Sequence, residues 1–348
     1  MRGEMGRGCG CLRVILPTAM VNRDNKVVQR VLVTGANGFI GQALCKELVE
    51  FGYQVLGAVR DLSRVNPDAM DVQYAAVGSL EQAVDWMPHL QDVDALVHLA
   101  GVAHYLGPHT EAAVERFYRI NVTATRMLAE QAAAAGVRRF VYLSSIKVNG
   151  EVTNGHPFSA DDPPRPEGIY GQSKLEAEQV LHAICKDKGM ELVVIRPTLV
   201  YGPNVRGNLQ RLMRLINSGL PLPLGGIDNR RSMIGVGNLC DLIRTCIIHP
   251  AAPGHVFLAT DGEDVSTPEL IRRLANLMGR KPKLIPVPLF ILRATGLLLG
   301  RREEMQRLTS SLQVDITKTK KVLGWMPPVP LDEGLKTMVT EARGTTDS

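Results

Sequence analysis

The stretch Val31-Leu32-Val33-Thr34-Gly35-Ala36-Asn37-Gly38-Phe39-Ile40-Gly41 decides the fold of this chain. A run of β-branched and apolar residues ends in three glycines spaced three residues apart, and an amphipathic segment at residues 42–49 follows. This order predicts a buried strand, a tight turn and a helix. Glycine is needed where the backbone turns sharply, where a phosphate approaches the main chain and where helix packs on strand. Because the first N–H groups of such a helix point at an anion, the stretch indicates a dinucleotide-binding site.

The composition is that of an enzyme-sized globular chain. Its 348 residues suit a large single unit or two lobes that share a cleft, and a hydrophobic content of 45% can bury a core. The formal charge of +5 is small for this length and comes partly from arginines in the first 30 residues, so we expect no nucleic-acid partner. The six cysteines form no CxxC pair and no His/Cys ligand cluster, which predicts a reduced, cytoplasmic protein without disulfides or a metal site.

Both ends of the chain differ from the rest. Residues 1–29 are rich in Gly and Arg, and their apolar run at 14–16 is too short for the hydrophobic region of a signal peptide. We expect a disordered extension or a start codon assigned too early, with Met20 as the alternative start. The polar residues 342–348 are expected to form a disordered tail.

Strand and helix signals alternate through the middle of the chain, with helix signals at 110–136. Further strands are expected at residues 52–60, 72–76, 95–101 and 139–145. The alternation predicts a Rossmann-type doubly wound parallel α/β sheet over residues 30–197, with ligands at the carboxyl ends of its strands. A smaller C-terminal α+β lobe, built mainly from residues 198–341 with some elements returning to the sheet, is expected to hold the substrate. His98 falls inside a strand, so we expect a packed histidine and not an acid or base.

The end of the second strand bears on the choice of cofactor. An NAD site usually has Asp or Glu there, about 20 residues beyond the glycines, to accept hydrogen bonds from the ribose hydroxyls. Here Val59 and Arg60 occupy the end, followed by Asp61. The planar fork of donors on arginine suits a 2′-phosphate, which favours NADP(H). In the alternative, Arg60 is a solvated strand-end residue and NAD(H) is the cofactor.

Three further residues form a candidate catalytic set. Tyr170 and Lys174 are four apart at the start of a helix signal and therefore lie on one helical face. A tyrosine hydroxyl near pKa 10 is a poor acid or base at neutral pH, but a nearby ammonium lowers that pKa and makes proton transfer feasible. Ser145, at a strand end, can hold the reacting oxygen. Tyr-x-x-x-Lys alone occurs by chance in many chains, and its combination with the glycine motif and Ser144-Ser145 is far more specific.

At these residues the chain resembles the extended short-chain dehydrogenase/reductase superfamily, in its NAD-dependent epimerase/dehydratase branch. The resemblance extends from about residue 30 to residue 335 and rests on the following motifs: Thr34-Gly35-Ala36-Asn37-Gly38-Phe39-Ile40-Gly41, His98-Leu99-Ala100-Gly101, Asn121, Ser144-Ser145, Tyr170-x-x-x-Lys174 and Arg196-Pro197. The interval from Ser145 to Tyr170, 170 − 145 = 25, is also usual there. The chain departs from the NAD-bound epimerases at Val59, where they carry the ribose-binding Asp.

The resemblance implies a role for each matching residue. Tyr170 would be the acid/base, Lys174 would bridge to the nicotinamide ribose, Ser145 would bind the substrate oxygen, and Asn121 would support the active-site network. The residues expected to bind the cofactor are Gly35, Asn37, Gly38, Phe39, Ile40, Gly41, Arg60, Leu99, Ala100, Gly101, Tyr170, Lys174 and Pro197.

The second lobe is expected to hold a UDP-sugar. In nucleotide-sugar enzymes of this branch, the arginine that matches Arg231 looks like a ligand of the UDP pyrophosphate, and a guanidinium fork suits a diphosphate. Asn208 matches a position that tends to hold the nucleotide, while Arg230 and Arg231 could also form a solvated basic surface. Residues 284–300 are apolar but too short and too interrupted by Pro286, Pro288 and Arg293 for a membrane span, so we expect a buried helix or lobe cap.

The segments at 144–151 and 221–225 look most like UDP-N-acetyl-α-D-quinovosamine dehydrogenases, which are 4-keto reductases of bacterial O-antigen synthesis. We therefore expect reduction of a UDP-4-keto-6-deoxy-N-acetylhexosamine. One alternative is a UDP-sugar 4-epimerase that retains NAD, and another is a non-catalytic NADP(H)-sensing protein on the same fold. A sensor has no need of Ser145, Tyr170 and Lys174, which favours an enzyme. Many proteins of this branch are dimers, so a homodimer is possible.

Overall fold

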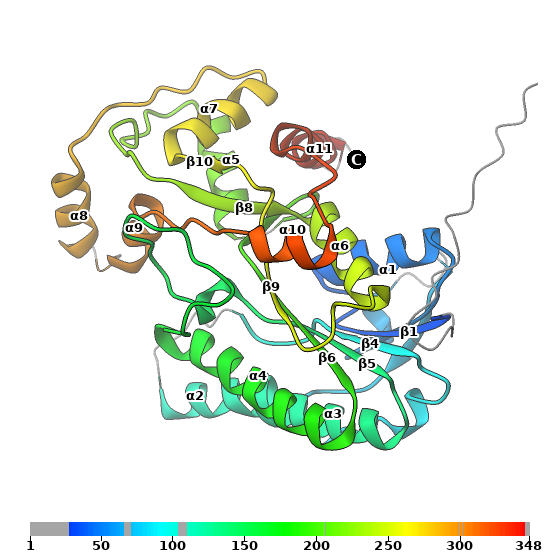
Figure 1. Ribbon diagram of the computed structural model, residues 1–348. Helices are drawn as coiled ribbons and strands as arrows, with labels where there is room; N and C mark the ends of the chain where they lie inside the picture. The colour runs from blue at the N-terminus through cyan, green and yellow to red at the C-terminus, as the bar shows by residue number, and fades with distance from the viewer. Residues whose placement is uncertain are drawn as a thin grey trace, which may run out of the picture.

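The computed structural model describes residues 28–65, 71–103, 110–205, 207–298, 300 and 302–344. A seven-stranded sheet forms its centre, in the order β3-β2-β1-β4-β5-β6-β9 (Figure 1). All neighbouring strands in it are parallel. The strands are β1 (Arg30–Thr34), β2 (Gln54–Val59), β3 (Gln73–Ala76), β4 (Ala95–His98), β5 (Arg139–Leu143), β6 (Glu191–Pro197) and β9 (Val256–Ala259). The predicted Rossmann-type doubly wound sheet is confirmed.

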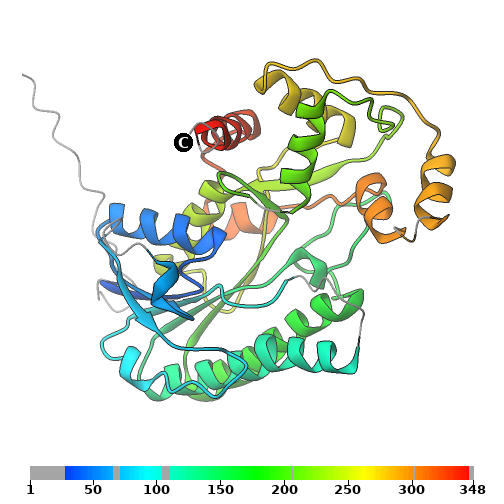
Figure 2. The same ribbon diagram turned by 180° about the vertical axis from the view of Figure 1, so that it is seen from behind.

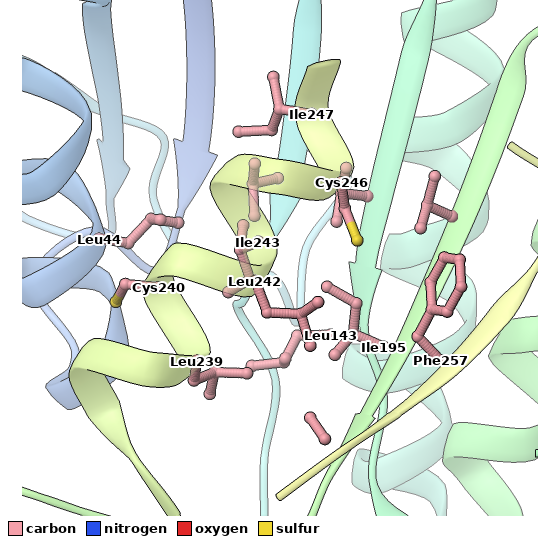
Figure 3. Packing of buried hydrophobic residues seen from close by; sticks show 14 of the residues in the cluster. Leu44, Leu143, Ile195, Leu239, Cys240, Leu242, Ile243, Cys246, Ile247 and Phe257 are labelled. Carbon is pink, nitrogen blue, oxygen red and sulfur yellow. The ribbon is translucent and has the colours of Figure 1, made fainter. Parts of the chain in front are cut away.

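Helices cover both faces of this sheet, as Figures 1 and 2 show. One face carries α1 (Phe39–Glu50) and α6 (Val236–Ile248), and the other carries α3 (Ala124–Ala134) and α4 (Gly168–Lys188). Because both faces are buried, the strands are nearly continuous apolar runs and not alternating ones. Figure 3 shows the packing of α6, where Leu239 and Ile243 lie over Leu143 of β5 and Ile195 of β6.

A second lobe follows β6 and has its own sheet and core. Its three strands are β7 (Leu199–Tyr201), β8 (Arg231–Gly235) and β10 (Asp264–Val265), in the order β10-β8-β7. The helices of this part of the chain are α5 (Asn208–Ser218), α7 (Thr267–Leu277), α8 (Leu289–Leu298), α9 (Arg302–Thr309), α10 (Thr317–Leu323) and α11 (Leu331–Gly344). Their core joins Tyr201, Ile271 and Leu335, which are almost fully buried. β9 and α10 return to the large sheet, where the buried Thr319 hydroxyl donates to the Leu258 carbonyl at 2.8 Å.

The helix signal at 110–136 resolves into two helices and an irregular turn. α2 (Glu111–Tyr118) is followed by the π-helical turn η4 (Arg119–Thr123) and then by α3. Single π turns inside helices recur at functional sites because they redirect one side chain. Here the turn carries Asn121, which is buried. Three short 3-10 turns complete the described elements: η1 (Leu62–Arg64), η3 (Met87–His89) and η5 (Ile146–Val148).

The apolar segment at 284–300 and the two ends of the chain differ in part from expectation. Of the two expectations for residues 284–300, the buried helix is wrong, because α8 packs through Leu292 and Gly296 and exposes most of its other residues, while the lobe cap stays a prediction. No helix among the described residues is long and apolar enough to cross a membrane. Of the segments expected to be disordered, residues 1–27 and 345–348 lie outside the described residues. Val28 is buried, the Gln29 N–H donates to the Asp94 carboxylate at 2.8 Å, and residues 342–344 form the end of α11.

The contact between Gly41 and the turn before it gives a test of the fold. A Cβ at Gly41 would overlap the Gly35 carbonyl oxygen and lie 2.8 Å from the Ala36 Cα, and backbone cannot yield as a side chain can. We expect Gly41→Ala to cost about 1–3 kcal/mol or more and to lower the melting temperature by several degrees.

Gly237→Ala is the matched control, because a Cβ at this position in α6 meets nothing within 4 Å. We expect it to raise stability by roughly 0.5–1 kcal/mol, since alanine loses less backbone entropy in a helix. Thermal melts of both variants under identical conditions check the pair. Equal melting temperatures for the two variants would contradict the close approach of α1 to the turn.

Candidate active site

The turn between β1 and α1 forms a cradle for an anion. Gly35 has φ of +68°, and a Cβ there would lie 3.1 Å from the Ala100 backbone N. Gly38 caps α1 without a side-chain hydrogen bond, and the first turn of the helix has no acidic residue. The positive end of the helix dipole is therefore not neutralised by the protein itself. A dinucleotide phosphate fits this arrangement, with Asn37, Phe39 and Ile40 at the same turn.

The end of β2 presents a cation beside a carboxylate that is engaged in a turn. Val59 is buried, and Arg60 directly after it is exposed. The Asp61 carboxylate accepts hydrogen bonds from the Ser63 N–H at 2.9 Å and the Ser63 hydroxyl at 2.6 Å, which turns it into the cap of η1. The pKa of Glu81 is lowered mainly by its hydrogen bond with Arg116 and, more weakly, by charges that include Arg60. Arg60 therefore acts electrostatically at this edge of the sheet.

A buried chain of hydrogen bonds fixes the end of β4. The Thr125 hydroxyl donates to the Asn121 carbonyl oxygen at 2.8 Å, so it accepts from His98 Nε2 at 2.9 Å. His98 Nδ1 then accepts from the Thr34 hydroxyl at 2.7 Å. Burial lowers the pKa of His98 to about 3, with the Lys174 charge adding to the effect. His98 is thus a neutral packed histidine, as expected from its place in a strand.

The same series of hydrogen bonds positions the backbone that is expected to face the cofactor. The Thr34 oxygen accepts from the N–H groups of Leu99 and Ala100, both at 3.2 Å. A Cβ at Gly101 would lie 3.0 Å from Asn121 Oδ1. The residues after β4 are therefore held closely by β1 on one side and by the π turn on the other.

Asn121 joins two parts of the site through its side chain. Its Oδ1 accepts from the Val102 N–H at 2.9 Å, and its Nδ2 donates to the Val102 carbonyl at 3.1 Å and to the Ser173 hydroxyl at 3.0 Å. The side chain thus links the segment after β4 to helix α4. The supporting role of Asn121 in catalysis stays a prediction.

Ser145 and Tyr170 meet across the carboxyl end of β5. Ser145 caps η5, where its oxygen accepts from the Lys147 N–H at 3.3 Å, and Tyr170 lies in the first turn of α4. Burial raises the pKa of Tyr170 to about 12, and a side-chain hydrogen bond with Ser145 opposes the rise. The structure therefore brings together two residues that are 25 positions apart in the sequence.

Lys174 lies on the same face of α4 but is directed elsewhere. Its Nζ donates to the Leu143 carbonyl at 2.9 Å and lies 4.6 Å from the centre of the Tyr142 ring. Burial lowers the pKa of Lys174 to about 8, and the charge of Glu178 opposes this. The expected lowering of the Tyr170 pKa is not seen here, because burial outweighs it and the ammonium faces the end of β5.

Sequence analysis missed a buried ion pair below these residues. The Arg196 guanidinium donates to both Glu178 carboxylate oxygens, at 2.9 and 2.5 Å, and to Asn149 Oδ1 at 2.9 Å. Glu178 also accepts from the Ser144 hydroxyl. The available signal was the spacing of Tyr170, Lys174 and Glu178, which repeats every four residues on one helical face.

Arg231 and Asn208, the residues expected to bind the substrate, have different surroundings in the second lobe. Arg231 Nη1 donates to the carbonyls of Arg307 at 2.8 Å and Ser310 at 3.0 Å, so it ties β8 to the end of α9. Burial lowers the pKa of Arg231 from its ordinary value. Asn208 is the exposed first residue of α5, and Pro197 is buried at the end of β6.

An open hollow of about 700 Å³ lies beside the end of α9. Its lining residues are Val152, Asn154, Glu167, Arg293, Ala294, Leu297, Met305, Gln306 and Ser310. Ser310 both lines the hollow and accepts from Arg231, and Glu167 directly precedes the helix that carries Tyr170. Arg231 is therefore near the hollow, whereas Asn208 is not among its lining residues. The described residues contain no group of three His, Cys, Asp or Glu side chains that could hold a metal ion.

The fold and this site define an enzyme of the extended short-chain dehydrogenase/reductase type. The chain belongs to the NAD dependent epimerase/dehydratase family, whose model matches residues 31–259. It is 44% identical over 320 residues to a UDP-glucose 4-epimerase of Vibrio cholerae, covering 91% of this chain and 96% of the relative.

More distant relatives match most of the chain. The N-acetyl-α-D-glucosaminyl-diphospho-ditrans,octacis-undecaprenol 4-epimerase of Escherichia coli O157:H7 is 27% identical over 323 residues, which cover 88% of this chain and 92% of the relative. The solved structure of MoeE5 in complex with UDP-glucose and NAD has a TM-score of 0.74 at 27% identity, covering 91% of this chain and 99% of that one.

The side chain of Asn121 offers a test of the site that needs no substrate. Asn121→Ala removes three hydrogen bonds and leaves Val102 and Ser173 groups without them in a part-buried setting. We expect a loss of at least about 2 kcal/mol in stability. Because the segment after β4 loses its anchor, the dissociation constant for NADPH should also rise roughly tenfold.

Thermal melting and calorimetric titration with NADPH measure the two effects. Asn276→Ala is the matched control, because this asparagine lies exposed on α7. It should change stability by no more than about 0.5 kcal/mol. An Asn121→Ala protein with unchanged NADPH affinity would show that the segment after β4 does not depend on this side chain for its cofactor contacts.

Proposed function

We propose that the chain is an NADPH-dependent reductase of a UDP-4-keto-6-deoxy-N-acetylhexosamine in bacterial O-antigen synthesis. The observation that carries the reductase direction is the end of β2, where Arg60 is exposed, Val59 is buried and Asp61 is engaged in a turn. An arginine there favours a 2′-phosphate over free ribose hydroxyls. NADPH is consumed in each turnover, so its use fits a net reduction better than an internal return of hydride.

The chain's own side chains supply the other half of the reaction. Bound in the cradle before α1, NADPH supplies the hydride that reduces the carbonyl carbon. Tyr170 donates its hydroxyl proton to the ketone oxygen, which Ser145 holds by hydrogen bonding, and the product is a secondary alcohol. Lys174 stabilises the resulting phenolate, which regains its proton from solvent. Asn121 and Gly101 keep the segment after β4 in place during this step.

The second lobe is proposed to hold the UDP group. The support is the hollow beside α9, its link to Arg231 through Ser310, and relatives whose names specify UDP-sugars. Arg231 would meet the diphosphate after giving up part of its contact with the α9 carbonyls. The described cysteines Cys45, Cys185, Cys240 and Cys246 are buried free thiols, which supports a reducing compartment such as the cytoplasm.

A 4-epimerase is the competing function, and the 44% identity to a protein of that name favours it. An epimerase returns the hydride to the same sugar and can retain NAD, so it causes no net oxidation of NADPH. Incubating the purified protein with UDP-4-keto sugars and NADPH, and following absorbance, separates the two functions. Stoichiometric loss of NADPH supports the reductase, whereas interconversion of UDP-hexoses on retained NAD identifies the epimerase.

The proposed role of Arg60 predicts a loss of cofactor affinity that is selective for NADPH. Arg60→Ala should raise the Michaelis constant for NADPH by roughly tenfold to a hundredfold, because a charge-assisted hydrogen bond contributes about 1.5–3 kcal/mol. The constant for NADH should change little. Arg272→Ala, an exposed arginine on α7, controls for loss of one positive charge. Equal effects of Arg60→Ala on both cofactors would remove this assignment.

The proposed proton transfer predicts a large loss of turnover without a change of fold. Tyr170→Phe keeps the ring and removes the proton donor, so turnover should fall about 10²–10⁴-fold while NADPH affinity is retained. Lys174→Met should be at least as damaging, since it affects both proton transfer and cofactor placement. Single-turnover NADPH oxidation with saturating keto sugar measures both. A Tyr170→Phe enzyme within about threefold of wild type, far outside that range, would exclude the mechanism.

A further inference from the structure

Helix α8 exposes the side chains that a globular helix usually buries. Phe290 is 72% exposed, Leu297 is 64% exposed and Leu298 is 84% exposed. Ile291 is also exposed, and the buried residues of the helix are Leu292 and Gly296. Single exposed apolar residues are common, but a contiguous group of large ones marks a surface that contacts something.

The exposed residues form one stripe along the helix. At 100° per residue, Leu297, Phe290, Ala294, Leu298 and Ile291 follow one another around the face opposite Leu292 and Gly296. Thr295 does not interrupt the apolar character, because its hydroxyl donates to the Ile291 and Leu292 carbonyls of its own helix. The stripe is therefore apolar along the whole length of α8.

The stripe also adjoins the candidate active site. Arg293, Ala294 and Leu297 line the hollow that Glu167 reaches from the start of α4. One edge of the helix thus forms a wall of the hollow, and its other residues continue outward. Figure 1 shows α8 at the outer edge of the lobe, joined to α7 by a long extended segment.

Charge indicates the occupant of this surface. Residues 280–300 contain Arg280, Lys281, Lys283 and Arg293 and no acidic residue. All four side chains are exposed, as is the apolar Ile285 between them. A basic segment with an exposed apolar helix is the combination that binds the interface of anionic bilayers, where apolar residues enter the headgroup region and cations meet the phosphates.

We infer that the edge formed by residues 280–298 docks on an anionic lipid surface, with α8 lying parallel to it. The hollow beside α8 then opens close to the membrane. Arg293, Ala294 and Leu297 also line the hollow proposed for UDP, so the surface is tested at Phe290 and Leu298, which do not line it. The helix lies on the bilayer and does not cross it, consistent with its ten residues.

Vesicle sedimentation of the full chain tests the inference. We expect binding to vesicles of phosphatidylcholine with about one third phosphatidylglycerol, and at least roughly tenfold weaker binding to phosphatidylcholine alone. Phe290→Ser/Leu298→Ser should lower partitioning at least about tenfold through lost apolar insertion. Lys281→Glu/Lys283→Glu should do the same through lost attraction, and raised salt should reproduce the second effect.

Two variants match these changes elsewhere on the molecule. Met326→Ser removes another largely exposed apolar side chain, and Lys186→Glu/Lys188→Glu makes the same change of charge at the end of α4. Both should bind as wild type does, and all variants should melt within roughly 2 °C of it, since exposed substitutions perturb stability little.

Absence of wild-type binding to the anionic vesicles would overturn the inference, as would equal losses in the control variants. The other occupant of such a face is a second copy of the chain. Light scattering without vesicles decides this point: a wild-type dimer that becomes monomeric in Phe290→Ser/Leu298→Ser, with no vesicle binding, assigns the stripe to self-association. None of these outcomes alters the NADPH assay, so failure here is distinct from failure of the proposed reductase activity.

Discussion

The buried ion pair between Glu178 and Arg196 constrains the arrangement of the active site. Both side chains are more than nine-tenths buried, and removing two charges from water is costly unless geometry and hydrogen bonding compensate. Here two parallel N–H···O bonds join the guanidinium to the carboxylate, Asn149 accepts a third, and Ser144 donates to Glu178. Helix α4 cannot slide or rotate against β6 without leaving a charge uncompensated, so the pair fixes how the helix meets the sheet.

The side chains proposed to react depend on that position. Tyr170, Lys174 and Glu178 repeat every four residues, so a helix held at Glu178 presents the other two on the same face toward the end of β5. Ser144 bonds to Glu178 and its neighbour Ser145 bonds to Tyr170, which sets the strand end and the helix in register. From the opposite direction, Asn121 reaches Ser173 on α4 from the π turn. The large sheet provides the strand ends at which these side chains lie, and the polar contacts align the side chains with one another.

Local patterns in the sequence were sufficient for the sheet and insufficient for parts of the site. The strand, turn and helix around Gly35 and Gly41 were predictable because glycine spacing and apolar runs report local sterics. The π turn at Asn121 was not, since one extra residue in a helical turn leaves the apolar period nearly unchanged. The apolar content of α8 correctly indicated a helix but gave the wrong burial, because burial depends on which elements pack there. The contacts of Arg231 with α9 carbonyls likewise join positions about 80 residues apart, beyond any local pattern.

The two shifted pKa values bear on the proton transfer that a reductase and an epimerase both need. Burial moves the pKa of Tyr170 up to about 12 and that of Lys174 down to about 8, so both groups hold their protons at neutral pH. Donation of the Tyr170 proton to a ketone leaves a buried phenolate, and the desolvation that raises this pKa makes the phenol a weaker acid. An epimerase must first remove a proton from a sugar hydroxyl, and the buried phenol is a poor base until a positive charge offsets its desolvation. In either direction the step therefore needs a positive charge near the phenol, so Lys174 has to turn from the Leu143 carbonyl, to which it donates in this structure, to stabilise the phenolate.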